Sequence, residues 1–218
     1  MIKDAILDKD RKYRYMLKRQ WGERKDNLVN FVLLNPSTAN EIVDDPTIKA
    51  CIKFSQNWGY DGFYVTNLFA FRTKSPNVLK KSEDPIGDEN DKYIKEYAHK
   101  SKLVVIAWGN HGNFLNRNNE ILKILSKIKI PHCLAITKSG SPKHPLYIKR
   151  NTNIKKWLES DLNLVRFEPQ KCLCQSADCA KCLLVNCTVE NCKVHTKDKK
   201  ENFRMEYKNR QKRRQRKT

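Results

Sequence analysis

Polar side chains that could bind a ligand and transfer protons follow four apolar stretches of this 218-residue chain. Amide, hydroxyl and imidazole groups at the mouth of a crevice are common binding, acid and base groups in enzymes. Asn35, Ser37 and Thr38 come directly after the apolar run 31–34. An ordinary strand-to-helix turn is the alternative interpretation of this first group. The other three groups surround Asn67, Trp108 to His111, and His144.

The elements that precede these groups alternate between strands and helices. Apolar runs predict strands at 28–34, 63–68, 103–107 and 132–136. Capped entries and helical spacing predict helices beginning near 46, 84 and 116, and a final helix is expected to reach about residue 158. The pattern predicts a three-layer α/β domain with a mainly parallel central sheet, and 13–21 with 28–34 predict an antiparallel edge hairpin. The four polar groups should then meet at the carboxyl edge of the sheet.

Composition favours a globular protein with an anionic partner. Hydrophobic residues make up 39% of the chain and charged residues 31%, and the net charge is +20. Nucleic acid is the commonest partner of so basic a protein. The start, Met1 to Arg14, lacks the apolar core of a signal peptide, and no run approaches the ~20 apolar residues of a membrane span. We therefore expect an intracellular protein that does not enter a membrane.

Six of the eight cysteines lie between residues 172 and 192, and a histidine follows at 195. Zinc takes four thiolate or imidazole ligands tetrahedrally, so seven ligands suit two ions that share a thiolate, or one ion with spare thiols. A disulfide knot is the alternative. Because the segment has few large apolar residues, it needs the metal to fold, and we expect a structural zinc module at 169–196. The candidate ligands are Cys172, Cys174, Cys179, Cys182, Cys187, Cys192 and His195.

The chain ends in a basic run whose candidate nucleic-acid-binding residues are Lys208, Arg210, Lys212, Arg213, Arg214, Arg216 and Lys217. Such runs are disordered, and they bind phosphate backbones or serve as a nuclear-localisation address. A merely solvated tail is the alternative. The chain therefore divides into an α/β domain at 1–168, the zinc module at 169–196 and a basic tail at 197–218.

Several motifs of the α/β part resemble one family of domains. They are LNPSTA at 34–39, TNLFAFR at 66–72, DPIG at 84–87, AWG at 107–109 and HPLY at 144–147. On these motifs the chain is identified as a member of domain-of-unknown-function family 1643 (DUF1643), over about residues 11 to 158. The resemblance names a family without naming a function.

A more distant resemblance connects the same loops to the uracil-DNA glycosylase superfamily, a compact α/β fold with a parallel sheet. Asn35-Pro36 is similar to the end of the first motif of that superfamily. Thr66-Asn67, with Arg72 a few residues later, is similar to the end of a later strand in some of its families. His144-Pro145 is similar to its last motif. The resemblance implies that Asn35 positions the attacking water, that Asn67 reads the base, and that His144 stabilises the leaving base. It implies a small, deep pocket, because the base must leave the duplex.

Other residues could contribute to such a site. Phe69, Phe71 or Trp108 could stack on the base. Ser37, Thr38, Arg72 and His111 could bind the substrate. Asp44 and Asp45 have no counterpart in the glycosylase motifs and could form the acid/base pair. For several positions a structural role is the alternative: Asp45 could be only a helix cap, Asn67 a turn former, His111 a loop residue and Cys51 a core residue.

Three hypotheses follow for function. The first is an enzyme acting on a nucleobase or nucleotide, with N-glycosidic bond hydrolysis on DNA as the reaction and the zinc module and basic tail as a tether. The second is a noncatalytic zinc-containing protein that binds nucleic acid, with DNA favoured over RNA. The third is an enzyme with a small free substrate, whose tail only directs its nuclear or nucleoid localisation.

Overall fold

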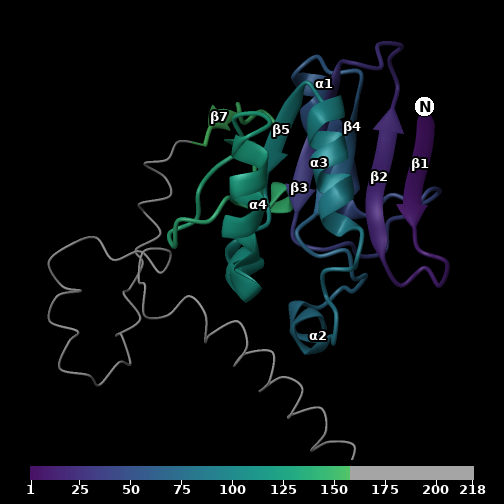
Figure 1. The fold of residues 1–218 in the computed structure, drawn as a ribbon. Coiled ribbons are helices and arrows are strands. Elements are labelled where there is room, and N and C mark those ends of the chain that lie inside the picture. The colour runs from purple at the N-terminus through teal and green to yellow at the C-terminus, as the bar shows by residue number, and fades with distance from the viewer. Residues whose placement is uncertain (158–218) are drawn as a thin grey trace, which may run out of the picture. The chain divides into compact units, whose positions relative to one another are not determined.

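The computed structural model describes residues 1–157, which form a mixed sheet with helices on both faces (Figure 1). Within this part no helix is long and apolar enough to cross a membrane. The strands are β1 (Ile2–Leu7), β2 (Arg14–Gln20), β3 (Leu28–Leu33), β4 (Gly62–Asn67), β5 (Leu103–Ile106), β6 (His132–Cys133) and β7 (Lys155–Lys156). The helices are α1 (Pro46–Asn57), α2 (Pro76–Lys81), α3 (Asn90–Lys100) and α4 (Arg117–Ser126), with the 3-10 helices η1 (Asn110–Asn116) and η2 (Pro145–Tyr147).

The strands lie in the order β1-β2-β4-β3-β5-β6-β7. Strands β4, β3, β5 and β6 pair in parallel, whereas β1, β2 and β7 pair antiparallel toward the two edges. The predicted α/β class with a mainly parallel central sheet is confirmed. All six residues of β3 are buried, as expected for a central strand that is covered on both faces.

Helices cover the two faces of the sheet and complete three layers. On one face, Ile48 and Phe54 of α1 pack with the buried side chains of β3 and β4. On the other, Ile94 of α3 and Ile121 and Leu125 of α4 pack with β5 and the opposite side of β3. Burial of each such side chain contributes about 1.5–3 kcal/mol relative to exposure. We call these the α1 face and the α3/α4 face.

The predicted hairpin of 13–21 with 28–34 is wrong in its partner. Strand β2 pairs with β4 and with β1, and β4 lies between β2 and β3. The apolar residues of β3 face both layers, so this strand takes a place between two parallel neighbours rather than beside the edge. The edge beside β2 is instead β1, a strand that was not predicted from the sequence.

The predicted final helix is also wrong. The segment after His144 forms the single turn of η2 and then the two-residue strand β7, which pairs antiparallel with β6. Asn151, Thr152 and Asn153 occupy the stretch between them. These residues are poor helix formers, because their side chains compete for backbone hydrogen bonds.

A bulge in β2 changes which face one arginine occupies. Ile6 pairs with Met16 and Leu7 pairs with Arg14, so Tyr15 is an extra residue in the ladder. The Tyr15 ring stacks on Tyr93 of α3, with ring centroids 5.2 Å apart. Arg14 therefore lies on the α1 face. Bulges of this kind commonly reorient a side chain near a functional site.

Candidate functional site

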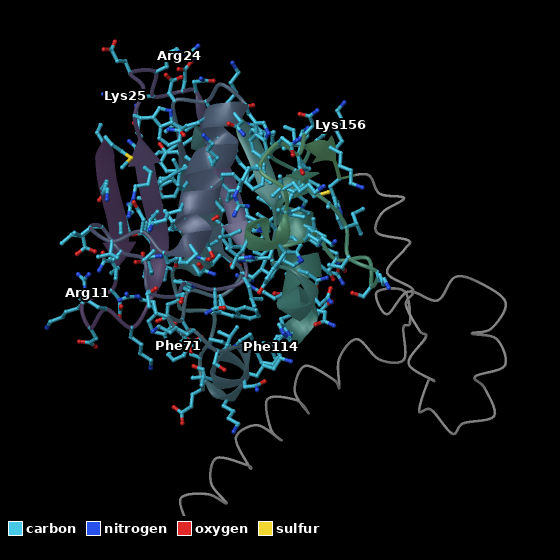
Figure 2. The ribbon with its side chains drawn as sticks, turned by 180° about the vertical axis from the view of Figure 1, so that it is seen from behind. Arg11, Arg24, Lys25, Phe71, Phe114 and Lys156 are labelled. Carbon is cyan, nitrogen blue, oxygen red and sulfur yellow. The ribbon has the colours of Figure 1, made fainter. Side chains whose placement is uncertain are left out.

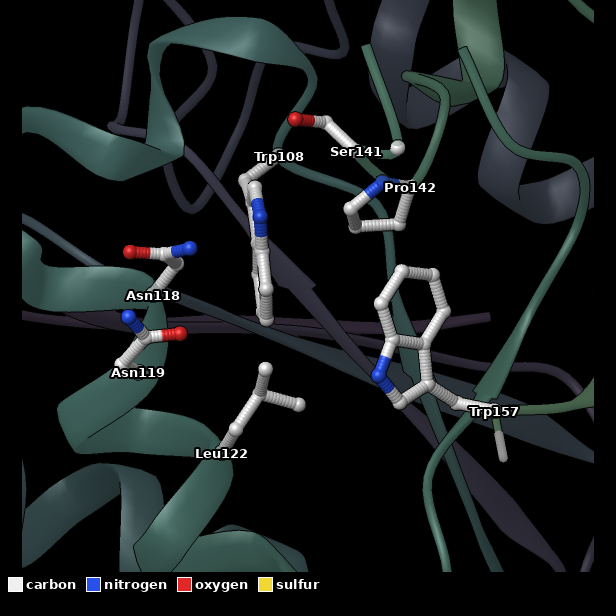
Figure 3. A pocket seen from close by; sticks show the side chains of 8 residues that line it. Trp108, Asn118, Asn119, Leu122, Ser141, Pro142 and Trp157 are labelled. Carbon is white, nitrogen blue, oxygen red and sulfur yellow. The ribbon is translucent and has the colours of Figure 1, made fainter. Parts of the chain in front are cut away.

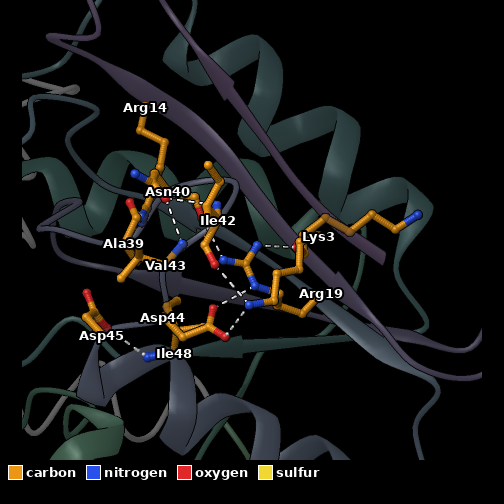
Figure 4. A network of polar contacts seen from close by, with 11 residues as sticks. Lys3, Arg14, Arg19, Ala39, Asn40, Ile42, Val43, Asp44, Asp45 and Ile48 are labelled. Carbon is orange, nitrogen blue, oxygen red and sulfur yellow. Dashed lines mark hydrogen bonds and ion pairs between the residues drawn. The ribbon is translucent and has the colours of Figure 1, made fainter. Parts of the chain in front are cut away.

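The loop that connects β3 to α1 is held in place by two buried arginines (Figure 4). Arg19 Nε donates to Asp44 Oδ1 at 2.7 Å, and its Nη2 donates to the main-chain oxygen of Asn40 at 2.6 Å. Arg14 Nη1 donates to the main-chain oxygen of Ala39 at 2.8 Å. Lys3 forms a second ion pair with Asp44, at 3.3 Å. These contacts fix the chain just before Asp45.

Asp45 begins α1 and also lies close to two other functional candidates. Its Oδ1 accepts a hydrogen bond of 2.9 Å from the main-chain nitrogen of Ile48, so the predicted N-cap is confirmed. Helix α1, which Asp45 caps, packs against η2, which begins after His144. Burial lowers the pKa of both His144 and Arg14, and the charge of Asp45 opposes the shift in each. The carboxylate is therefore a cap and, in addition, a neighbour of the predicted catalytic histidine.

His144 is partly buried at the start of η2. Its Nδ1 accepts a hydrogen bond of 3.3 Å from the main-chain nitrogen of Leu146. That bond assigns the proton of the neutral ring to Nε2. Burial lowers the pKa of His144, and Asp45 opposes the shift only in part. At neutral pH the ring is therefore uncharged and has Nε2–H as a hydrogen-bond donor.

Asn67 ends β4 with a side chain that has no hydrogen-bonding partner. The residue is 0% exposed, and neither Oδ1 nor Nδ2 has a partner among the described residues. Asn67 pairs in register with Leu33, which belongs to the α1-face core, so the two side chains share that face. A buried amide with both groups unused costs free energy and calls for an explanation, such as a bound ligand or water.

The backbone around Asn67 is fully engaged, in contrast to its side chain. Asn90 Nδ2 donates to the main-chain oxygens of Asn67 and Leu68, each at 3.0 Å. Arg117 Nε donates to the Leu68 oxygen at 2.9 Å. The main chain at the end of β4 is therefore fixed by hydrogen bonds, while the side-chain amide of Asn67 stays available to a ligand.

Arg14 and Arg72 carry two further unused polar groups. Arg14 is 2% exposed, and its Nε is buried without a partner. Burial lowers the pKa of Arg14 to about 10, and the positive charges of Arg72 and Arg19 add to this effect. Arg72 Nη1 donates to the main-chain oxygen of Arg11 at 2.8 Å, while its Nε is also buried and unpartnered. Arg14 was not predicted as a site residue, because its side of the sheet depends on the bulge at Tyr15.

Asn35 has a structural role in addition to any catalytic one. Its Nδ2 donates to the main-chain oxygens of Pro36 at 3.0 Å and Thr73 at 2.7 Å. These bonds join the loop after β3 to the loop after β4. The Oδ1 of Asn35 has no partner among the described residues. Ser37 is partly buried, and Thr38 is exposed at the outer side of the same loop.

The aromatic candidates lie on the other face of the sheet. Phe69 is fully buried in the α3/α4-face core, where its ring centroid is 5.5 Å from that of Phe114. Trp108 belongs to the same core. His111 is exposed in η1. The α1 face thus carries Arg14, Asp45 and Asn67, with His144 at the start of η2, which packs against α1, and with Arg72 on the segment that is joined to β2. Phe69 and Trp108 belong to the core of the other face.

A small hollow adjoins Trp108 on this second face (Figure 3). The rings of Trp108 and Trp157 and the side chain of Leu122 line it, with Asn118 at its rim. Its volume of about 10 Å³ is close to what one water molecule needs. Trp157 Nε1 and Asn118 Oδ1 are buried without partners among the described residues.

Residues 158–218 lie outside the described part of the chain, and with them all predicted zinc ligands and the basic tail. The boundaries at 168/169 and 196/197 stay predictions for the same reason. Among residues 1–157, no cluster of three or more histidine, cysteine or acidic side chains could hold a metal ion. Cys51 is buried in the α1-face core, as expected, and burial raises the pKa of its thiol.

Comparison with known protein families shows to which family this chain belongs. Residues 14–146 match the DUF1643 family, which is described as a protein of unknown function. The chain belongs to the DUF1643 family. No curated protein and no solved structure matches it. The DUF1643 match runs from the first residue of β2 to Leu146 in η2. It therefore includes Arg14, Asp45, Asn67, Arg72 and His144, which we call the α1-face cluster.

Proposed function

We propose that this DUF1643 protein is a nucleobase- or nucleotide-directed enzyme that hydrolyses N-glycosidic bonds in DNA. The observation that carries the proposal is the buried, unpartnered amide of Asn67 at the carboxyl end of β4. It lies on the face that also holds Asp45 and His144. A side-chain amide offers one donor and one acceptor in a plane, which is the pattern needed to bond the edge of a nucleobase.

The reaction assigns a role to each group. Water adds to C1′ of the sugar while the bond from C1′ to the base nitrogen breaks, and the bonding electron pair leaves with the base. The Nε2–H of neutral His144 donates to the departing base and stabilises its negative charge. The proton released by water passes to Asp45 or to solvent, and the free Oδ1 of Asn35 orients the water. The donor and acceptor of Asn67 hold the base in position.

A likeness to the uracil-DNA glycosylase fold is part of the proposal. It is supported by the parallel strands β4, β3, β5 and β6, with the motif residues Asn35, Asn67 and His144 following three of them. Chain order reverses between β3 and β5, and ligands of open α/β sheets bind outside the carboxyl ends of strands at such a point.

We further propose that the C-terminal segments tether the enzyme to DNA inside the cell. The cysteines and histidine between 172 and 195 would bind one or two structural zinc ions. The basic residues from 208 to 217 would bind phosphate backbones and set a nuclear or nucleoid localisation. In this proposal the C-terminal segments provide affinity for DNA and determine localisation, while the α/β domain catalyses the hydrolysis.

The test is release of free base from oligonucleotides that carry uracil, mismatched or modified bases. Release by the full chain, lost in His144→Asn, would support the hydrolase. Salt-sensitive binding without release from any of them would replace it by the noncatalytic nucleic-acid-binding protein. Release that is unchanged when the basic residues from 208 to 217 are replaced by Gln would show that the tail is not needed as a tether. Release from free nucleotides or nucleosides, with none from oligonucleotides, would indicate an enzyme with a small free substrate.

A further inference from the structure

Two arginines of the α1-face cluster are not used by the glycosidic mechanism. Arg14 comes from β2 and Arg72 from the loop after β4, and the backbones of their two segments are joined. Arg14 N donates to the Ala70 oxygen at 2.9 Å, and Arg72 N donates to the Lys12 oxygen at 3.0 Å. The two guanidinium groups are thus carried by neighbouring stretches of chain.

Both guanidinium groups lack a carboxylate partner. Among the described residues neither Arg14 nor Arg72 takes part in an ion pair, and the Nε of each is buried without a hydrogen bond. By contrast, the equally buried Arg19 is paired with Asp44. A buried cation is strongly destabilising unless an anion and further hydrogen bonds compensate it.

The charges of the cluster do not balance. Arg14, Arg19, Arg72 and Lys3 face the carboxylates of Asp44 and Asp45, and the charge of Arg72 also acts on Glu41, which is itself paired with Arg11. Asp44 is committed to Arg19 and Lys3, and one oxygen of Asp45 caps α1. A surplus of positive charge therefore remains at Arg14 and Arg72. Arginine favours oxyanions that accept several hydrogen bonds, and phosphate is the commonest of these.

We propose that Arg14 and Arg72 bind a phosphate group of the substrate, so that the substrate is a nucleotide, free or within a strand, and not a free nucleoside. The identity of the nucleoside rests on the proposed glycosidic function, but the phosphate site does not. The unpartnered Nε groups are the donors that the phosphate oxygens would fill. A bound phosphate would account for the buried Arg14 guanidinium and for the two buried, unpartnered Nε atoms.

The test measures binding separately from turnover. Calorimetry on the full chain compares inorganic phosphate, the four 2′-deoxynucleosides, their 5′-monophosphates and a short oligonucleotide, in about 0.3 M NaCl to screen the basic tail. The variants are Arg14→Gln and Arg72→Gln. The matched control is Arg24→Gln, which removes an exposed arginine at the opposite end of the sheet from Arg11, the hydrogen-bonding partner of Arg72 (Figure 2).

The proposal expects one nucleotide, or the oligonucleotide, to bind at least about 10-fold more tightly than the matching nucleoside, and each site variant to remove about 10-fold of that gain. Arg24→Gln should change nothing. If Arg14→Gln fails to fold, the proposal is decided by the affinity of Arg72→Gln for the nucleotide and by the ratio of nucleotide to nucleoside affinity in the wild type. Selective binding of the oligonucleotide alone would place the phosphate in a strand, and selective binding of a mononucleotide would place it in a free nucleotide.

Two results would overturn the proposal: equal binding of nucleotides and nucleosides by the wild type, or an equal loss in Arg24→Gln and the site variants. Phosphate-dependent binding without any base release would keep the phosphate site and remove the glycosidic reaction. Base release at the wild-type rate in both Arg14→Gln and Arg72→Gln would keep the glycosidic reaction and remove the phosphate site.

Discussion

Asn90 donates two hydrogen bonds of 3.0 Å to the main-chain oxygens of Asn67 and Leu68, while the side-chain amide of Asn67 itself has no partner. Both asparagines are fully buried. One amide therefore holds the end of β4, and the other is left unused beside it. This contrast separates a structural asparagine from one that is kept for a ligand, and it can be measured.

Replacement of Asn67 by leucine, which has nearly the same shape, should not destabilise the protein. Because no hydrogen bond is lost and an unpaired amide leaves the core, the free energy of unfolding should stay equal or rise by about 1 kcal/mol. The matched variant Asn90→Leu loses two bonds and should cost about 2 kcal/mol. Urea denaturation measures both. A cost for Asn67→Leu as large as that for Asn90→Leu would show that Asn67 is structural.

His144 should make the protein less stable in acid. Burial lowers the pKa of the folded-state ring, so the unfolded chain takes up the proton first as pH falls. Stability is fully present above the ordinary histidine pKa of about 6.5 and is lost as pH drops toward the folded-state pKa. His144→Asn should therefore flatten the dependence of unfolding free energy on pH below about 6.5. Equal slopes in wild type and His144→Asn would contradict this.

Arg19 should be the arginine whose loss destabilises the fold most directly. Its side chain is 0% exposed and bonds Asp44 and the main-chain oxygens of Lys18 and Asn40. Removing one partner of a buried pair typically costs about 3–5 kcal/mol, so Arg19→Gln should lower the free energy of unfolding by that order.

The control for this experiment is Arg24→Gln, because Arg24 is 66% exposed in its pair with Asp61. Exposed pairs contribute about 0–1 kcal/mol. Since Arg19 fixes the loop before Asp45, we also expect Arg19→Gln to lose base release. Similar costs for both variants in chemical denaturation would show that the loop is not held by the Arg19 network.

Zinc content should be one or two ions per chain in metal analysis of the purified protein. The ligands proposed from the sequence are thiolates and one imidazole, so chelation should release thiols that then react with alkylating agents. Cys51 and Cys133 are buried in the α/β domain and should stay unreactive until urea is added. A purified protein that contains no metal, and in which six thiols react without chelator, would contradict the proposed zinc module.

The sequence predicted the class of the fold and the start of α1 because those features follow from local patterns. The run Phe31 to Leu34 is apolar on both sides, as a central strand must be. Asp45-Pro46 pairs a capping carboxylate with a residue suited to the first helical position, and the structure has both. Loops after parallel strands gather at one edge of any such sheet, and the prediction that Asn35, Asn67 and His144 share one site rests on this rule.

The sequence could not predict which face of the sheet each residue occupies. Tyr15 is an extra residue in the β1–β2 ladder, and alternation along β2 gives no sign of it. The position of Arg14 in the site was missed for this reason. Phe69 and Trp108 were expected near the substrate, but the backbone beyond the strand ends turns both rings toward α3 and α4. The face of the sheet that a side chain occupies depends on the strand register and on the conformation of the loops, and both are set by tertiary packing.

The most direct test of the account is the single-turnover rate of base release by wild type and Asn67→Leu on the best oligonucleotide substrate. Because Asn67→Leu should stay folded, the comparison isolates the amide. The account predicts that the rate falls at least about 100-fold, as expected when a site loses a preorganised hydrogen-bonding group. A folded Asn67→Leu protein that releases base at the wild-type rate would contradict the central claim that this amide holds the base.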